Sequence, residues 1–158
     1  MPRLLALALV IVAALSPLST IAQTADDGNL AQFTSADGSK LFIVSRAELG
    51  LTTAEANVRE DYLVDQALAP VNDVGTLGKE LKGKDVPAIK GASPIRAWDV
   101  TIKDKPGKIW MFAANGWYYF SIVYQYDEKE AIKWIEGAIV SGERTLPTDP
   151  PKGLQPAS

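Results

Sequence analysis

The feature that most constrains the fold is the stretch from Ile95 to Tyr126, where three β-rich runs are separated by two turn signals. Asn115-Gly116 is a preferred pair for the two-residue type I′ turn that joins antiparallel strands. Pro106-Gly107 suits the earlier connection, closed either around this pair alone or around Asp104 to Gly107. The sequence therefore predicts a three-stranded antiparallel meander with strands over 95–103, 108–114 and 117–126.

The turn at Asn115-Gly116 also fixes the register of the last two strands. Counting outward pairs Ala114 with Trp117, and the same count pairs Phe112 with Tyr119 and Trp110 with Ser121. The two closures of the first connection differ by two residues, so both leave every side chain on the same face of the sheet. The meander thus has two faces whose members can be predicted.

One face, the Trp98 face, is apolar enough to form the main core; it holds Trp98, Val100, Ile102, Ile109, Met111, Phe120, Ile122 and Tyr124. The opposite face, the Trp110 face, mixes aromatic rings with hydrogen-bonding groups. Its candidate site residues are Trp110, Phe112, Trp117, Tyr119, Asp99, Thr101 and Ser121. Either another layer covers these rings as ordinary core, or the face is open as a platform for a sugar, a peptide or an apolar ligand.

Weaker signals place the remaining elements. A hairpin is predicted over 30–45 with Asp37-Gly38 as its turn, and a capping box at Thr52 predicts a helix over about 53–68. The stretch 70–94 either hides short strands or is a mobile flap. Asp127 caps a last helix that runs to Gly142, and its apolar stripe is expected on the Trp98 face.

These elements together define an α+β fold, in which an antiparallel sheet made of the hairpin and the meander 95–126 packs against a C-terminal helix. The domain is expected over 23–144. The tail, residues 145–158, holds Pro147, Pro150, Pro151 and Pro156 and is expected to be extended and disordered.

The first 22 residues have the layout of a cleavable secretory signal peptide. Arg3 precedes an apolar run from Leu4 to Leu15, and small residues at Thr20 and Ala22 place the cleavage before Gln23. The apolar run is shorter than the ~20 residues that a helix needs to span a bilayer. We therefore expect a mature form without a membrane span, located in the periplasm or secreted.

Composition excludes several kinds of chemistry. The chain has no Cys and no His, which removes nucleophile systems built on those residues and almost every zinc or copper site. No cofactor or metal is therefore expected. The formal net charge of −3 argues against nucleic acid, whose binding proteins normally show a basic surplus.

The chain is therefore expected to be a non-catalytic binding or accessory protein of the cell envelope or secretome that uses the Trp110 face. Its partner would be a small ligand, a glycan or an envelope protein. One alternative is a small hydrolase that uses carboxylates such as Asp99, Glu60, Asp61 and Asp65. Another is a purely structural docking partner of an envelope protein.

Overall fold

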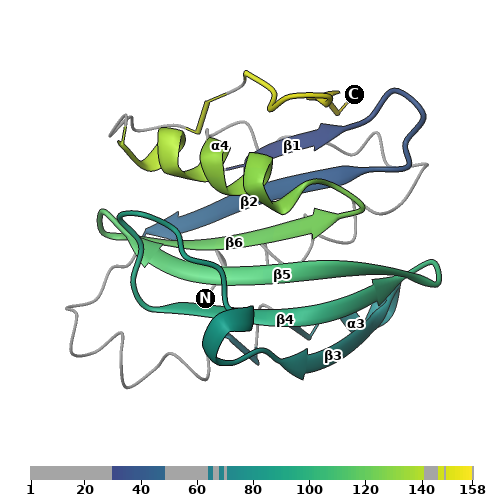
Figure 1. Cartoon of the computed structure of the whole chain (residues 1–158), viewed down its shortest axis with the longest axis horizontal. Helices are drawn as coiled ribbons and strands as arrows, with labels where there is room; N and C mark the ends of the chain where they lie inside the picture. The colour runs from purple at the N-terminus through teal and green to yellow at the C-terminus, as the bar shows by residue number, and fades with distance from the viewer. Residues whose placement is uncertain are drawn as a thin grey trace.

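The computed structural model describes residues 30–48, 64–65, 68–69, 71–140, 146–147 and 149–157. Its strands form one seven-stranded antiparallel sheet in the order β3-β4-β5-β6-β2-β1-β7, accompanied by helices (Figure 1). The predicted α+β class is thus confirmed in outline. The signal peptide predicted over 1–22 lies outside the described residues.

The meander forms the middle of the sheet as β4 (Ile95–Ile102), β5 (Lys105–Ala114) and β6 (Trp117–Tyr124). Ala114 pairs with Trp117, so the register predicted from the Asn115-Gly116 turn is confirmed along β5 and β6. Asn115 and Gly116 both have positive φ, 50° and 80°, as a type I′ turn requires.

The turn between β4 and β5 was predicted at the wrong place. It falls at Lys103-Asp104, which have φ of 50° and 62°, and Pro106 and Gly107 lie inside β5. Gly107 is needed there for space, because a Cβ would meet a Val100 methyl and the Val123 carbonyl oxygen at 3.2 Å each. The shift from the expected register is an even number of residues, so each side chain keeps its predicted face.

The N-terminal hairpin is confirmed as β1 (Leu30–Thr34) and β2 (Leu41–Glu48). Its loop is longer than the predicted two-residue turn, since Thr34 pairs with Leu41. Within the loop, the Asp37 carboxylate accepts hydrogen bonds from the Ser39 amide and hydroxyl at 3.0 and 2.7 Å. β2 pairs with β6 and so joins the hairpin to the meander.

The stretch 70–94 contains a short strand, the first of the two structures expected for it. α3 (Val71–Val74) leads into β3 (Thr76–Glu80), which pairs with β4 at one side of the sheet. A 3-10 turn, η1 (Gly83–Asp85), follows. Of the helix predicted over 53–68, only Val64, Asp65 and Leu68 are described, and these three residues are helical.

The Trp98 face is buried, as predicted. All eight of its predicted members belong to one cluster, together with Leu41 and Ile43 from the hairpin. The described residues that cover it come from outside the sheet: Val64, Leu68 and Val71 of α3.

The last helix, α4 (Glu128–Val140), begins where predicted, because the Asp127 carboxylate accepts hydrogen bonds from the amides of Lys129 and Glu130 at 2.8 and 3.1 Å. Its apolar residues Ala131, Ile135 and Ile139 belong to the cluster of the Trp110 face. Figure 1 shows α4 lying across β6, β2 and β1.

The prediction that this helix covers the Trp98 face is therefore wrong. The chain leaves β6 through Gln125, whose left-handed backbone (φ 54°) precedes the helix, and the helix then packs on the Trp110 side. Both faces carry large apolar side chains, so an apolar helical stripe fits either one. Adjacency in sequence does not distinguish them.

The tail also differs from its prediction as a disordered segment. Leu146 and Leu154 are buried, and β7 (Gln155–Pro156) pairs with β1. The indole nitrogen of Trp134 donates to the Asp149 carbonyl at 2.8 Å. Proline restricts the unfolded chain, which lowers the entropy lost on ordering, so a few apolar anchors are enough to hold a proline-rich segment.

Candidate functional site

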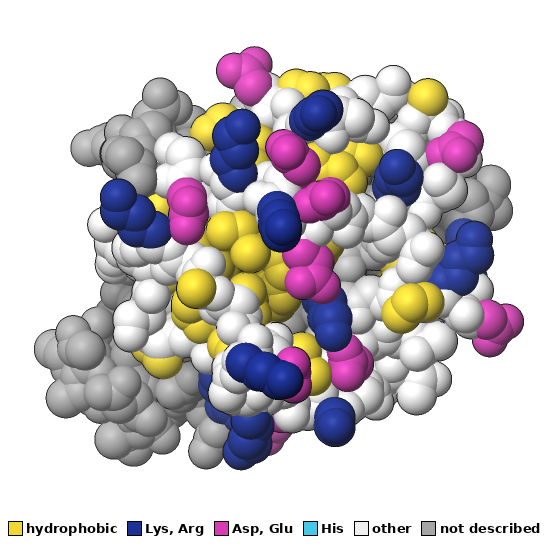
Figure 2. All heavy atoms as spheres, viewed as in Figure 1, with side chains coloured by type: hydrophobic (Ala, Val, Ile, Leu, Met, Phe, Trp, Pro, Cys, Tyr) yellow, Lys and Arg dark blue, Asp and Glu magenta, His cyan; other side chains and the backbone are white. Residues whose placement is uncertain are grey.

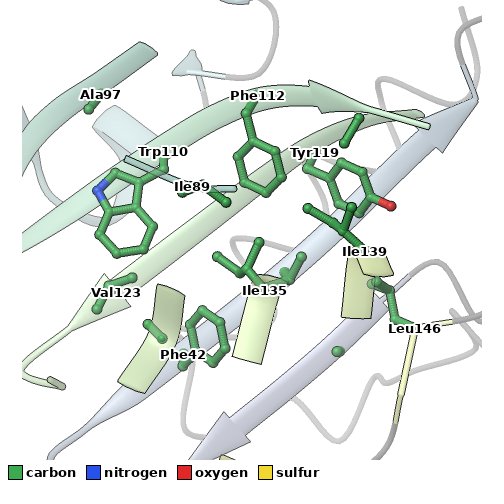
Figure 3. Packing of buried hydrophobic residues seen from close by; sticks show 14 of the residues in the cluster. Phe42, Ile89, Ala97, Trp110, Phe112, Tyr119, Val123, Ile135, Ile139 and Leu146 are labelled. Atoms are coloured by element: carbon green, nitrogen blue, oxygen red, sulfur yellow. The ribbon is translucent and has the colours of Figure 1, made fainter. Parts of the chain in front are cut away.

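Four of the seven candidate residues are fully inside the protein. Trp110, Phe112, Tyr119 and Ser121 expose 1%, 0%, 3% and 0% of their surface. The Ser121 hydroxyl donates to the Trp110 carbonyl at 3.3 Å. In Figure 3 the three rings lie among aliphatic side chains from α4 and from the segment 81–92, a packing typical of core.

Two segments cover this face. α4 lies over one part of it, and the segment 81–92 contributes Leu81 and Ile89 to the same cluster. The two are linked where the Lys90 amide donates to the Glu136 carboxylate at 2.8 Å. Of the two alternatives raised by the sequence, the covered face is therefore the one found, and an open aromatic platform is not.

Phe112 and Tyr119 are the cross-strand pair predicted by the register. Their rings stack at 5.0 Å between centroids with an angle of 8° between planes. In Figure 3 the pair lies near Ile139 and Leu146. Stacked pairs of this kind add about 0.5–1.5 kcal/mol beyond their buried area, so this pair stabilises the core.

Asp99 and Thr101 lie at the other end of the sheet from Trp117. Asp99 is half-buried and forms an ion pair with Lys108, whereas Thr101 is exposed. Thr101 pairs with Pro106 and Trp117 pairs with Ala114, which places them about 26 Å apart along β5 at ~3.3 Å per residue. The candidates therefore do not converge on one site.

Trp117 is the exception among the four aromatics, because it is only half-buried. The guanidinium of Arg46, from β2, lies 4.1 Å above the centre of its ring. Arg46 itself is 5% exposed, an unusual position for an arginine. A cation held over an indole in this way gains about 0.5–2 kcal/mol, more as the pair is desolvated.

Sequence reasoning missed Arg46. It pairs with Tyr119 because β2 lies beside β6, a contact between strands more than 70 positions apart in the sequence. Within β2, alternation places Arg46 on the same face as Phe42 and Val44, which belong to the Trp110-face cluster. A charged residue at an inward position of a strand was the one signal that pointed to it.

Each pKa shift among the described ionisable groups has a structural cause. Hydrogen bonding to Arg96, at 2.8 and 3.0 Å, holds the pKa of Glu80 below its usual value. Hydrogen bonds from Ser35 and Ser39 hold the pKa of Asp37 far below its usual value. Burial, helped by the charges of Glu130 and Asp127, raises the pKa of the Tyr126 hydroxyl.

Two of the four carboxylates proposed for a hydrolase lie outside the described part of the chain. Glu60 and Asp61 are not described, and Asp65 is exposed. Among the described residues, no three acidic side chains come together in a way that could hold a metal ion. Within the same ranges, no helix has the length and apolar character required to cross a bilayer.

The surface on the α4 side combines apolar and charged groups. Figure 2 shows hydrophobic side chains gathered near the middle of this side, with Lys, Arg, Asp and Glu around them. Seven partly buried hydrophobic residues border the cluster beneath: Val86, Ala92, Ile95, Trp117, Tyr126, Ile132 and Trp134. The aromatic members of this border, Trp117, Tyr126 and Trp134, are therefore partly exposed beside a buried cluster.

No protein-family model matches the chain, and no curated protein matches it. What the protein does is therefore inferred from its own residues.

Proposed function

We propose that the protein is an exported, non-catalytic binding or accessory protein of the cell envelope or secretome, and that it contacts its partner through Trp117, whose indole is held in place by Arg46. The observation that carries this proposal is the half-buried indole of Trp117 with the guanidinium of Arg46 4.1 Å above it. Trp110, Phe112 and Tyr119 serve the core beside this pair and are not themselves the contact surface.

Support for export comes from the N-terminal sequence. Arg3, the apolar run from Leu4 to Leu15 and the small residues at Thr20 and Ala22 follow the order of a secretory signal. The absence of Cys is compatible with an oxidising compartment, because the fold depends on packing rather than on disulfides. We therefore place the mature protein in the periplasm or outside the cell.

Support for binding comes from the residue types at this place. Trp and Arg are enriched among the few residues that dominate the energetics of protein interfaces. Arg46 is held by burial and by the ring, so little side-chain entropy remains to be lost when a partner binds. A protein of the envelope fits this arrangement better than a small apolar ligand, which would need the buried rings of Trp110 and Phe112.

The packing of α4 is part of the proposal. Trp134 of this helix meets Phe33 and Phe42 edge-on at 5.3 and 5.5 Å, which supports a firm seat on the sheet. With α4 in place, Trp110 stays buried, and Trp117 lies at the border of the area of the Trp110 face that is covered. A partner therefore meets a preformed surface and does not displace the helix.

The test is retention of the mature protein in the envelope fraction of a producing cell. Trp117→Ala should lower the retained fraction at least fivefold while the circular dichroism spectrum and the cooperative unfolding transition persist. Thr101→Ala is the matched control, because Thr101 is exposed at the far end of the same face, and it should leave retention unchanged. Equal retention of wild type and a folded Trp117→Ala variant would refute the proposal.

A further inference from the structure

A second aromatic group lies on the other side of α4, under the C-terminal tail. Phe33 and Phe42 from the hairpin, Tyr126 before the helix and Trp134 within it form a continuous set of ring contacts, with centroids 5.3 to 6.2 Å apart. We call these four residues the aromatic quartet. Figure 1 shows the tail running beside α4 and β1, the elements that carry Trp134 and Phe33.

The quartet holds the tail through two side-chain donors. The Trp134 indole nitrogen donates to the Asp149 carbonyl at 2.8 Å, and the Tyr126 hydroxyl donates to the Lys152 carbonyl at 2.7 Å. Burial and nearby carboxylates raise the pKa of Tyr126, so its hydroxyl keeps the proton that this bond requires. Both acceptors are backbone atoms, which any residue can supply.

Buried side chains of the tail would make the site selective for particular peptide sequences. Pro151 and Leu154 are buried, and the Leu154 amide bonds back to the Pro151 carbonyl at 3.1 Å. Gly153 closes this turn with φ of 82°, a conformation that favours glycine. After the turn, Pro156 pairs with Phe33, and the Ala157 amide donates to the Gln32 carbonyl at 2.9 Å.

Two ring donors bonded to backbone carbonyls of a proline-rich segment resemble the contacts by which proline-rich peptides are recognised. Aromatic rings accept the proline surface, ring N–H and O–H groups bond the peptide carbonyls, and proline brings few amides that need partners. The tail segment carries Pro147, Pro150, Pro151 and Pro156. The Trp134 and Tyr126 donors bond carbonyls of this segment as ring donors do in complexes with separate proline-rich peptides.

We infer that the aromatic quartet is an acceptor site for a proline-rich peptide segment of another polypeptide, and that the tail of this chain is its resident occupant. A competing segment needs paired prolines followed by a turn and a leucine, the features that the tail presents. Because the tail belongs to the same chain, its effective concentration at the site is high. The tail thus blocks the site until a competitor displaces it.

The experiment uses the full chain with Gly153→Val. A Cβ at Gly153 meets no atom within 4 Å, so this change strains the turn through its positive φ and removes nothing from the core. Leu154→Asp is the second variant, which weakens the same contact by burying a charge. Release is followed by the NMR signal of the Trp134 indole N–H and by hydrogen exchange of the Ala157 amide.

The probe is a synthetic peptide with the sequence of residues 146–157. It should bind the Gly153→Val chain saturably, with a Kd at least tenfold lower than its apparent Kd for the wild-type chain, and it should restore the wild-type Trp134 indole signal. A peptide with the Leu154→Asp change is the control ligand and should bind at least tenfold more weakly. Adding Trp134→Phe to the variant chain should weaken the binding of the wild-type peptide at least fivefold.

Three outcomes would overturn the inference. The tail is integral core if both Gly153→Val and Leu154→Asp abolish cooperative unfolding of the domain. The tail is not a displaceable ligand if both variants keep the wild-type exchange rate at Ala157. The site is not an acceptor if the tail is released and the peptide binds neither variant more tightly than the wild-type chain. None of these results depends on Trp117, so this test and the test of the proposed function can fail separately.

Discussion

The two faces of the sheet are both buried, but they are closed differently at their borders. At the Trp98 face, the described border combines a polar pair with apolar side chains. Arg96 lies 5.2 Å from the centre of the Trp98 ring and bonds Glu80 on the edge strand β3, and Leu30, Leu77 and Tyr118 are partly buried against the cluster. At the Trp110 face, α4, the segment 81–92 and the tail meet over the sheet, and partly exposed aromatic rings lie between them. Trp117 and Trp134 are two of these rings.

This difference indicates where binding side chains can lie on a small domain of this kind. A face covered by several separate segments has internal borders, and large rings at those borders are both positioned by the core and reachable from outside. Trp117 lies at such a border, and so do Tyr126 and Trp134 of the aromatic quartet.

The largest effect is expected from removing a ring at the centre of either face. Trp110→Ala on one face and Phe120→Ala on the other should each lower the free energy of unfolding by about 3–5 kcal/mol, the usual result of truncating a buried aromatic residue. Denaturant titration would measure both. The control Thr101→Ala should change stability by less than about 0.5 kcal/mol.

The equality of the two effects is what tests the comparison. If Trp110→Ala were nearly neutral while Phe120→Ala remained costly, the Trp110 face would be open in solution, and its cover would not be α4 and the segment 81–92.

A smaller effect should reveal on which face α4 packs. The Trp134→Ala and Phe42→Ala changes should couple by about 0.5–1.5 kcal/mol in a double-mutant cycle, because their rings meet edge-on at 5.5 Å. Trp134→Ala paired with Phe120→Ala should be additive within about 0.5 kcal/mol, since Phe120 lies on the opposite face. The reverse pattern of coupling would place the helix on the Trp98 face.

The smallest effect on stability is expected from the polar pair at the border of the Trp98 face, Arg96 with Glu80. Hydrogen bonding to Arg96 lowers the pKa of Glu80 from 4.5, so the pair stabilises the fold above pH 4.5, and this contribution is lost as the pH falls through the folded-state pKa. Glu80→Gln should therefore destabilise the protein by less than about 1 kcal/mol at pH 7. The difference between variant and wild type should shrink below pH 4.5, as measured by thermal unfolding.

A difference that stays constant from pH 7 to pH 3 would contradict this account of the Glu80 and Arg96 pair. Glu80 would then act through packing rather than through its charge.

Much of the sheet could be predicted from the sequence because local chemistry determines it. Asn115-Gly116 favours a turn that suits a two-residue hairpin, and it set the register of β5 and β6 correctly. Pro106-Gly107 gave the wrong position for the turn between β4 and β5, because Gly107 serves close packing against Val100 and the Val123 carbonyl. The observed turn lies at Lys103-Asp104. Both residues have left-handed backbone, but their residue types do not predict such a turn.

The candidate site was less predictable because it depends on contacts between distant segments. Pleat counting placed Trp110, Phe112, Trp117 and Tyr119 on one face correctly, but it did not reveal what covers them. Arg46 reaches Trp117 only because β2 pairs with β6. The tail was predicted to be disordered from its prolines, whereas Leu154 and the Trp134 indole hold it on the domain.

The most direct test of the central claim is hydroxyl-radical footprinting of the wild-type protein, read by mass spectrometry at each tryptophan. We expect rapid oxidation at Trp117, slower oxidation at Trp134 beneath the tail, and strong protection of Trp110 and Trp98, which expose 1% and 5% of their surface. Oxidation of Trp110 at a rate similar to that of Trp117 would contradict this expectation, because the face between α4 and the segment 81–92 would then be open to solvent.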